Sequence, residues 1–101
     1  VIKKGEHGAI LYSNDMIFPA SGYPLENIVD PTGAGDSFAG GFLGHLARKN
    51  RINDTIFKEA VAYGNVMGSF AVEDFGIGRL LSITRDDIEK RYNVYKEFIH
   101  F

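Results

Sequence analysis

The feature that most constrains this chain is a segment rich in glycine and aspartate, where an extended run gives way to a helical pattern. Residues 27–42 read NIVDPTGAGDSFAGGF, and apolar runs flank them on both sides. Glycine weakens a helix, but it also lets a backbone approach a ligand closely and adopt a positive φ. The segment therefore predicts a strand-to-helix junction whose central glycines can adopt a positive φ and let a ligand approach the backbone.

The residues at this junction suit phosphate chemistry. A helix N-terminus exposes backbone N–H groups and a partial positive charge, which together attract an anion. Gly33 and Gly35 allow the run TGAG to form a nest of N–H donors for a phosphate. The Asp36 carboxylate opposes phosphate binding, but it suits a general base that takes a proton from a hydroxyl. The pattern thus favours transfer of a phosphoryl group to an alcohol.

The same residues allow other interpretations. Glycine and aspartate at a helix start also form an ordinary cap, so a purely structural role is one alternative. A P-loop would need a Lys followed by a Ser or Thr directly after its second glycine, and no such pair follows these glycines in that spacing. A dinucleotide fingerprint would need a third small residue where Phe38 stands. Gly40, Gly41 and Gly44 are predicted to let the helix pack closely against a neighbour.

The first twenty residues predict a β-meander. Short apolar runs at residues 9–13 and 16–20 are separated by turn residues, and a further apolar run begins the chain. Pro19 is expected to end the third strand.

Helical periodicity begins at Gly35 and returns twice further along the chain. In the first helix two apolar series recur every four residues: Phe38, Phe42 and Leu46, and Ala39, Leu43 and Ala47. Asn53 or Asp54 is expected to cap a second helix that runs to about Glu73. Thr84 and Asp87 have the spacing of a capping box for a third helix. The second helix carries an apolar and small face: Ile56, Ala60, Tyr63, Gly64, Met67 and Ala71.

At this point the sequence resembles the PfkB, or ribokinase-like, sugar and nucleoside kinases. The run DPTGAGDSFAGGF, residues 30–42, is similar to that family's C-terminal signature, D-x-T-G-A-G-D-x-F. The run VIKKGEHGAIL before it is similar to the family's strand, G-x-x-G turn and strand, and the small-residue helix and the loop AVEDFG after it also fit. The resemblance implies phosphorylation of a sugar or nucleoside hydroxyl by ATP.

The resemblance also implies roles for individual residues. Asp36 matches the catalytic base. The matching anion hole comprises Gly33, Ala34 and Gly35, and nucleotide contacts are implied at Gly5, Glu6, Gly8 and Asn65. A monovalent cation, usually K⁺, is implied beside the anion hole, at Asp30, Thr32, Ala71, Asp74 and Gly76. Mg²⁺ is expected to arrive with ATP.

The resemblance implies an α/β fold of three layers, α/β/α, of which residues 1–101 form the C-terminal nucleotide-binding and catalytic portion. The chain begins in strand-like sequence without an initiator Met, so we expect it to be a piece of a longer protein. The family's N-terminal, substrate-binding half is absent, so the isolated fragment is expected to have little or no activity. The choice of sugar or nucleoside stays open.

Composition excludes several classes of protein. Net charge is −2, which argues against a nucleic-acid partner, and no apolar run is long enough for a membrane helix. The chain has no cysteine, which fits a reducing cytoplasm and excludes disulfides and thiolate metal sites. The expected partner is a small-molecule sugar or nucleoside, and a homodimer is also considered. A non-catalytic nucleotide- or anion-binding module, and a dinucleotide-binding oxidoreductase piece, are the alternative functions.

The remaining chemistry-bearing residues are interpreted structurally. His7, His45 and His100 lack metal-ligand spacing, so each is expected to be structural or solvent-exposed. The aromatic residues near the C-terminus are expected to pack a last helix against the core, with an exposed, self-associating patch as the alternative.

Overall fold

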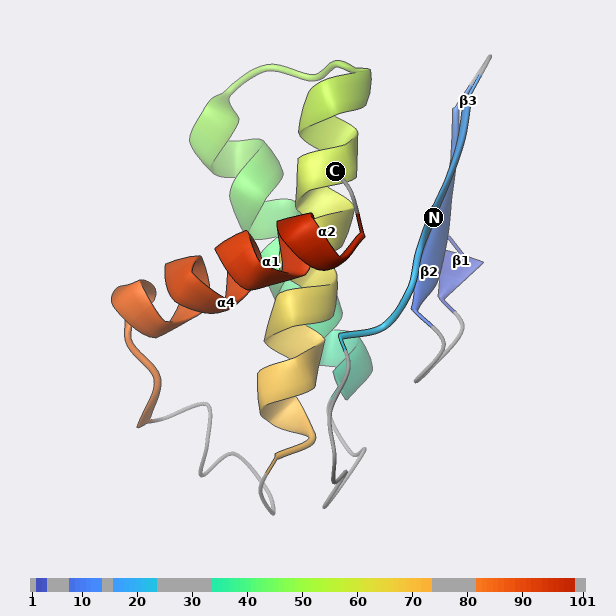
Figure 1. The fold of residues 1–101 in the computed structure, drawn as a ribbon. Coiled ribbons are helices and arrows are strands. Elements are labelled where there is room, and N and C mark those ends of the chain that lie inside the picture. The colour runs from blue at the N-terminus through green and yellow to red at the C-terminus, as the bar shows by residue number, and fades with distance from the viewer. Residues whose placement is uncertain (1, 4–7, 14–15, 24–33, 74–81, 100–101) are drawn as a thin grey trace.

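The computed structural model describes residues 2–3, 8–13, 16–23, 34–73 and 82–99 of the chain. Within these residues a small antiparallel sheet lies on one side of the molecule and three helices lie on the other (Figure 1). The α/β class predicted from the sequence is therefore confirmed.

The sheet contains three strands in the order β1-β2-β3, each antiparallel to its neighbour. They are β1 (Ile2–Lys3), β2 (Ala9–Ser13) and β3 (Met16–Ala20). The register pairs Ile2 with Ile10, and Leu11 with Phe18. Because successive side chains alternate between faces, Leu11 points towards the helices while Tyr12, its neighbour, is exposed. The predicted β-meander is confirmed.

The helices are α1 (Ala34–Lys49), α2 (Asp54–Ala71) and α4 (Arg85–Phe98). Asn53 caps α2 through a hydrogen bond from the Ile56 backbone N–H to Asn53 Oδ1 at 2.8 Å, as the sequence predicted. The predicted capping box of α4 is also present, because Thr84 and Asp87 each accept a hydrogen bond from the other's backbone N–H. Local side-chain chemistry thus sets the start of two of these helices.

Two apolar clusters hold the layers together. One joins the sheet to α1 and α2, and its buried members are Ala9, Leu11, Ala20, Phe38 and Val61. The other joins α2 to α4, and its buried members are Ala62, Tyr63, Val66, Phe70, Tyr92 and Tyr95. Helix α2 contributes to both, so it is the central element of the described fold, and α4 crosses it in Figure 1.

Some expectations about buried faces were wrong. In α1, the series that begins with Phe38 is buried or half-buried, but Leu43 in the second series is 61% exposed. Near the C-terminus, Tyr92 and Tyr95 are buried as predicted, whereas Phe98 is half-exposed. Helix α1 packs mainly against α2 and meets the sheet through Phe38, so among the described residues the face that carries Leu43 is left uncovered.

Candidate functional site

The predicted phosphate-binding junction leads into the N-terminus of α1. Ala34 and Gly35 are the first two residues of this helix, and Asp36 lies in its first turn. Gly35 and Asp36 are both exposed. A Cβ added at Gly35 would meet no atom within 4 Å, so the side of the helix at this position is open. The N-terminus of a helix attracts an anion, and an exposed carboxylate beside it can accept a proton from a hydroxyl group.

Packing against α2 fixes the position of this first turn. Phe38, two residues after Asp36, is 5% exposed and packs against Leu11 and Val61. A Cβ added at Gly64 would lie 2.7 Å from the Phe38 ring, and one added at Gly68 would lie 3.5 Å from the Ala34 carbonyl oxygen. The glycine face of α2 therefore lets the start of α1 approach closely, and so it positions Asp36 through the backbone.

Gly8, predicted to contact the nucleotide, lies at the start of β2 with φ of +96°. It is buried, and an added Cβ would overlap the Ala20 carbonyl oxygen and the backbone of Ser21 and Gly22. Only glycine combines this backbone conformation with the close approach to the end of β3. Gly5 and Glu6, the other residues predicted in this turn, lie outside the described residues.

Asn65, the weaker nucleotide candidate, is buried in α2. Its side-chain amide nitrogen donates to Tyr95 Oη at 2.8 Å and to the Ala20 carbonyl oxygen at 3.4 Å. Both hydrogens of that amide are thus used within the protein, which gives Asn65 a clear structural role. A nucleotide contact by Asn65 stays a prediction.

The structure brings several predicted site residues together around the C-terminal half of α2. The Ala20 carbonyl oxygen is the common neighbour of Gly8 and Asn65. One turn beyond Asn65, the Gly68 position faces Ala34 at the start of α1. Segments far apart in sequence therefore converge on one end of the helical layer.

The remaining predicted site residues are described only in part. Ala71, predicted to contribute to the cation site, is the buried last residue of α2. The others lie outside the described residues: Gly33, Asp30, Thr32, Asp74 and Gly76. Among the residues that the structure describes, no group of three or more His, Asp or Glu side chains could hold a metal ion. Within the same residues no helix is long and apolar enough to cross a membrane.

Sequence reasoning missed a clamp between α2 and α4. Arg91 donates to both carboxylate oxygens of Glu73, at 2.9 and 3.2 Å, and to the Ser69 hydroxyl at 2.9 Å. Its guanidinium also lies 3.7 Å from the centroid of the Phe70 ring. These partners are about twenty residues away in sequence, so no local motif could have indicated them.

Comparison with known proteins identifies the family. Residues 1–83 match the family described as pfkB family carbohydrate kinase. The chain belongs to this family. Among curated relatives, aminoimidazole riboside kinase of Salmonella typhimurium is 39% identical over 74 residues, which cover 71% of this chain and 22% of that protein. Cytidine kinase of Thermococcus kodakarensis is 44% identical over 57 residues, which cover 55% of this chain and 20% of that protein. The chain therefore spans about a fifth of the length of these relatives.

Solved structures of pfkB-type kinases share the fold. The structure of aminoimidazole riboside kinase from Salmonella enterica, complexed with aminoimidazole riboside and an ATP analogue, matches with a TM-score of 0.75 and 33% identity over 86% of this chain and 29% of that one. The fructokinase of Vibrio cholerae, with fructose, ADP and calcium bound, matches with a TM-score of 0.68 and 31% identity over 73% of this chain and 24% of that one. The described elements are thus part of the ribokinase-like α/β fold.

Proposed function

We propose that this chain is the C-terminal, catalytic portion of a kinase that transfers a phosphoryl group from ATP to a hydroxyl of a sugar or nucleoside. The observation that carries the proposal is the exposed Asp36 in the first turn of α1, held in place by the buried Phe38. The pfkB family match, which includes this helix, supports the same conclusion.

In this proposal the residues of the helix start have separate tasks. The Asp36 carboxylate accepts the proton of the acceptor hydroxyl as its oxygen forms a bond to the γ-phosphorus and the bond to the leaving ADP breaks. Backbone N–H groups of Gly33, Ala34 and Gly35 donate to the transferred phosphoryl group, where negative charge develops. The helix dipole adds to this stabilisation because its positive end faces the same position.

A nucleotide phosphate is proposed to bind at this position, because the N–H groups at a helix start form a general anion site. The open space beside Gly35 supports this placement. Gly5, Glu6, Gly8 and Asn65 are proposed to bind the rest of the nucleotide. Bound Mg²⁺ would neutralise the phosphate charge. K⁺ is proposed to bind at residues 30, 32, 71, 74 and 76.

The acceptor is proposed to be a sugar or nucleoside because of the relatives. One is named a riboside kinase and another a cytidine kinase, and one solved neighbour contains fructose. The chain spans 29% of the aminoimidazole riboside kinase structure. The residues that bind the acceptor are therefore expected outside this chain. Without them the alcohol and the γ-phosphate are not held together, and the isolated chain is expected to have little or no turnover. A cytoplasmic location and a homodimer also stay predictions.

The test uses the protein encoded by the complete reading frame that contains this chain. ADP release is assayed over a panel of sugars and nucleosides with ATP, Mg²⁺ and K⁺. Asp36→Asn is expected to lower kcat by about 100-fold or more, the low end for loss of a positioned base. Asp86→Asn is the matched control, because Asp86 is an exposed aspartate in the first turn of α4. It is expected to leave kcat unchanged.

Other outcomes would redirect the assignment. Equal turnover in the parent and in Asp36→Asn would remove Asp36 from the mechanism. ATP binding by calorimetry without turnover on any acceptor would favour the non-catalytic nucleotide-binding module. Family membership already favours a kinase over the dinucleotide-binding alternative.

A further inference from the structure

A pocket of about 270 Å³ opens between α1, α2 and α4. Its lining residues come from all three helices: Gly40, Gly41, Gly44, His45, Arg48, Tyr63, Met67, Arg85 and Ile88. None of them belongs to the residues proposed above to bind ATP or the acceptor. A Cβ added at Gly40 or Gly44 would meet no atom within 4 Å, so these glycines leave open space along α1. The prediction that Gly40 and Gly44 serve close packing was therefore wrong, and it is confirmed only for Gly41.

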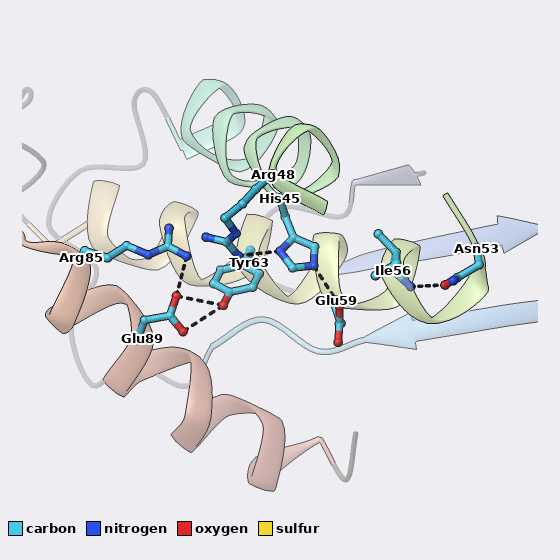
Figure 2. A network of polar contacts seen from close by, with 8 residues as sticks. All are labelled: His45, Arg48, Asn53, Ile56, Glu59, Tyr63, Arg85 and Glu89. Atoms are coloured by element: carbon cyan, nitrogen blue, oxygen red, sulfur yellow. Dashed lines mark hydrogen bonds and ion pairs between the residues drawn. The ribbon is translucent and has the colours of Figure 1, made fainter. Parts of the chain in front are cut away.

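Figure 2 shows a network of polar contacts that includes four of the lining residues: His45, Arg48, Tyr63 and Arg85. His45, which is 4% exposed, has its Nε2 atom 2.9 Å from the Glu59 carboxylate and its Nδ1 atom 2.8 Å from the Arg48 guanidinium. A guanidinium can only donate, so Nδ1 is the acceptor. Nε2 then carries the proton and donates to Glu59, and the imidazole is neutral in this arrangement.

In this tautomer the neutral imidazole lies between the positive guanidinium of Arg48 and the negative carboxylate of Glu59. Among the described residues no carboxylate forms a direct ion pair with Arg48. Arg85, the second guanidinium of the pocket, lies 2.7 Å from Glu89 and is neutralised there. Of the two guanidinium groups that line the pocket, Arg48 is therefore the one without a direct ion pair among the described residues, and it is exposed.

Two carboxylates belong to this network but do not line the pocket. Neither Glu59 nor Glu89 is among the described residues that line it. Glu59 is engaged by His45, and Glu89 accepts from Arg85 and from the Tyr63 hydroxyl at 2.9 Å. Burial raises the pKa of Tyr63 to about 12, so this phenol stays neutral and adds no negative charge. The walls away from the rim are the Tyr63 ring, Met67 and Ile88.

We propose that this pocket binds a small organic anion, with a carboxylate or phosphate head on Arg48 and an apolar body against Tyr63, Met67 and Ile88. The volume lies just below the roughly 300–1,000 Å³ of sites for drug-sized ligands, so it suits a molecule with about one ring. A guanidinium is the side chain best matched to the planar fork of a carboxylate or to a phosphate. The proposal is independent of kinase activity.

The test is fluorine NMR of small probes with the protein from the complete reading frame, in the presence of saturating ATP. The probes are para-fluorobenzoate and para-fluorophenyl phosphate, which distinguish a carboxylate from a phosphate head. Neutral para-fluorobenzamide is the control. Binding of one anionic probe with a Kd on the order of 1 mM is expected for a ligand of this size. At least about 10-fold weaker binding is expected for the neutral probe.

Variants locate the binding. Arg48→Gln retains a hydrogen-bond donor for His45 but removes the positive charge. It is expected to weaken binding of the anionic probe by about 10-fold or more. Gly44→Leu and, as a second variant, Gly40→Leu place a side chain in open space within the pocket and are expected to abolish binding. Asn93→Leu adds the same side chain at an exposed position of α4 outside the pocket and is expected to change nothing.

The proposal is overturned if neither anion binds, or if the neutral probe binds equally well. It is also overturned if binding persists in Arg48→Gln and in both glycine variants, because the anion would then sit elsewhere.

Discussion

Tyr95 is the residue at which three segments of the chain meet. It is fully buried in α4, accepts a hydrogen bond from Asn65 of α2, and donates to the Ser21 carbonyl oxygen that follows β3. Ser21 precedes the segment that leads to the predicted anion hole. The C-terminal helix is thereby tied to the approach to the candidate site.

Replacement of Tyr95 by Phe should destabilise the protein by about 1–3 kcal/mol, because one N–H of the buried Asn65 amide loses its acceptor and the hydrogen bond to the Ser21 carbonyl oxygen is also lost. Urea denaturation monitored by circular dichroism measures this. Tyr12→Phe is the control, since Tyr12 is 52% exposed and should change stability by less than about 0.5 kcal/mol. Equal effects of the two substitutions would show that the Tyr95 hydrogen bonds add no net stability.

Buried tyrosines predict a loss of stability in alkali. Burial raises the pKa of Tyr63 and of Tyr95 from the ordinary value of 10 to about 12, and it also raises that of Tyr92. Between these values the folded state holds protons that the unfolded state has lost, so the free energy of unfolding falls as pH rises. The contribution is fully present below pH 10 and disappears as the pH passes through about 12.

Chemical denaturation at about pH 8 and about pH 11 measures this dependence. The free energy of unfolding should be lower at the higher pH, and Tyr63→Phe should reduce the difference. A difference that is unchanged in Tyr63→Phe would assign the alkaline instability to other groups.

Among the elements, α2 begins with a side-chain cap. Because Asn53 accepts from the Ile56 N–H at the helix start, Asn53→Ala should cost about 0.5–2 kcal/mol. Thermal or urea denaturation checks the value. Asn93→Ala in the exposed middle of α4 removes the same side chain where it caps nothing, and Ala there should be neutral or slightly stabilising.

Replacing either of two adjacent glycines of α1 by Ala should have opposite effects on the free energy of unfolding. A Cβ at Gly41 would lie 2.7 Å from the Tyr63 carbonyl oxygen, so Gly41→Ala should force the α1–α2 contact apart and destabilise the protein. At Gly40 the space is open, and Gly40→Ala should stabilise the helix by about 0.5–1 kcal/mol. Urea denaturation of the two variants gives the comparison. The same sign for both would mean that the close contact is relieved by small shifts.

For the whole molecule, one sheet face turns away from the helices and is apolar. Tyr12 and Ile17 are register partners on this face and are 52% and 66% exposed. An apolar face of this kind promotes association. The 101-residue chain expressed alone should therefore self-associate with increasing concentration, and Ile17→Lys should suppress this. Sedimentation velocity measures both. A chain that stays monomeric at all concentrations would contradict the prediction.

Much of this architecture could be predicted because its signals are local. Short apolar runs bounded by turn residues indicated β2 and β3, and a period near four indicated the buried face of α1 that contains Phe38. Asn53, Thr84 and Asp87 satisfy backbone groups only a few residues away, so the helix starts were also predictable. The same holds for the signature around Asp36, which indicated the family before any fold was known.

Contacts between distant segments could be assigned only from the tertiary structure. The sequence predicted close helix packing for both Gly40 and Gly41. Only the tertiary structure shows that Gly41 contacts α2 while Gly40 faces open space. His45 showed no orienting partner in sequence, because Glu59 approaches from another helix. Sequence by itself determined the elements and the caps of α2 and α4, and it indicated the family through the Asp36 segment, since these signals depend on neighbours along the chain. The tertiary structure alone decided which side chains meet and which glycines line a pocket, because those properties depend on the relative placement of whole helices.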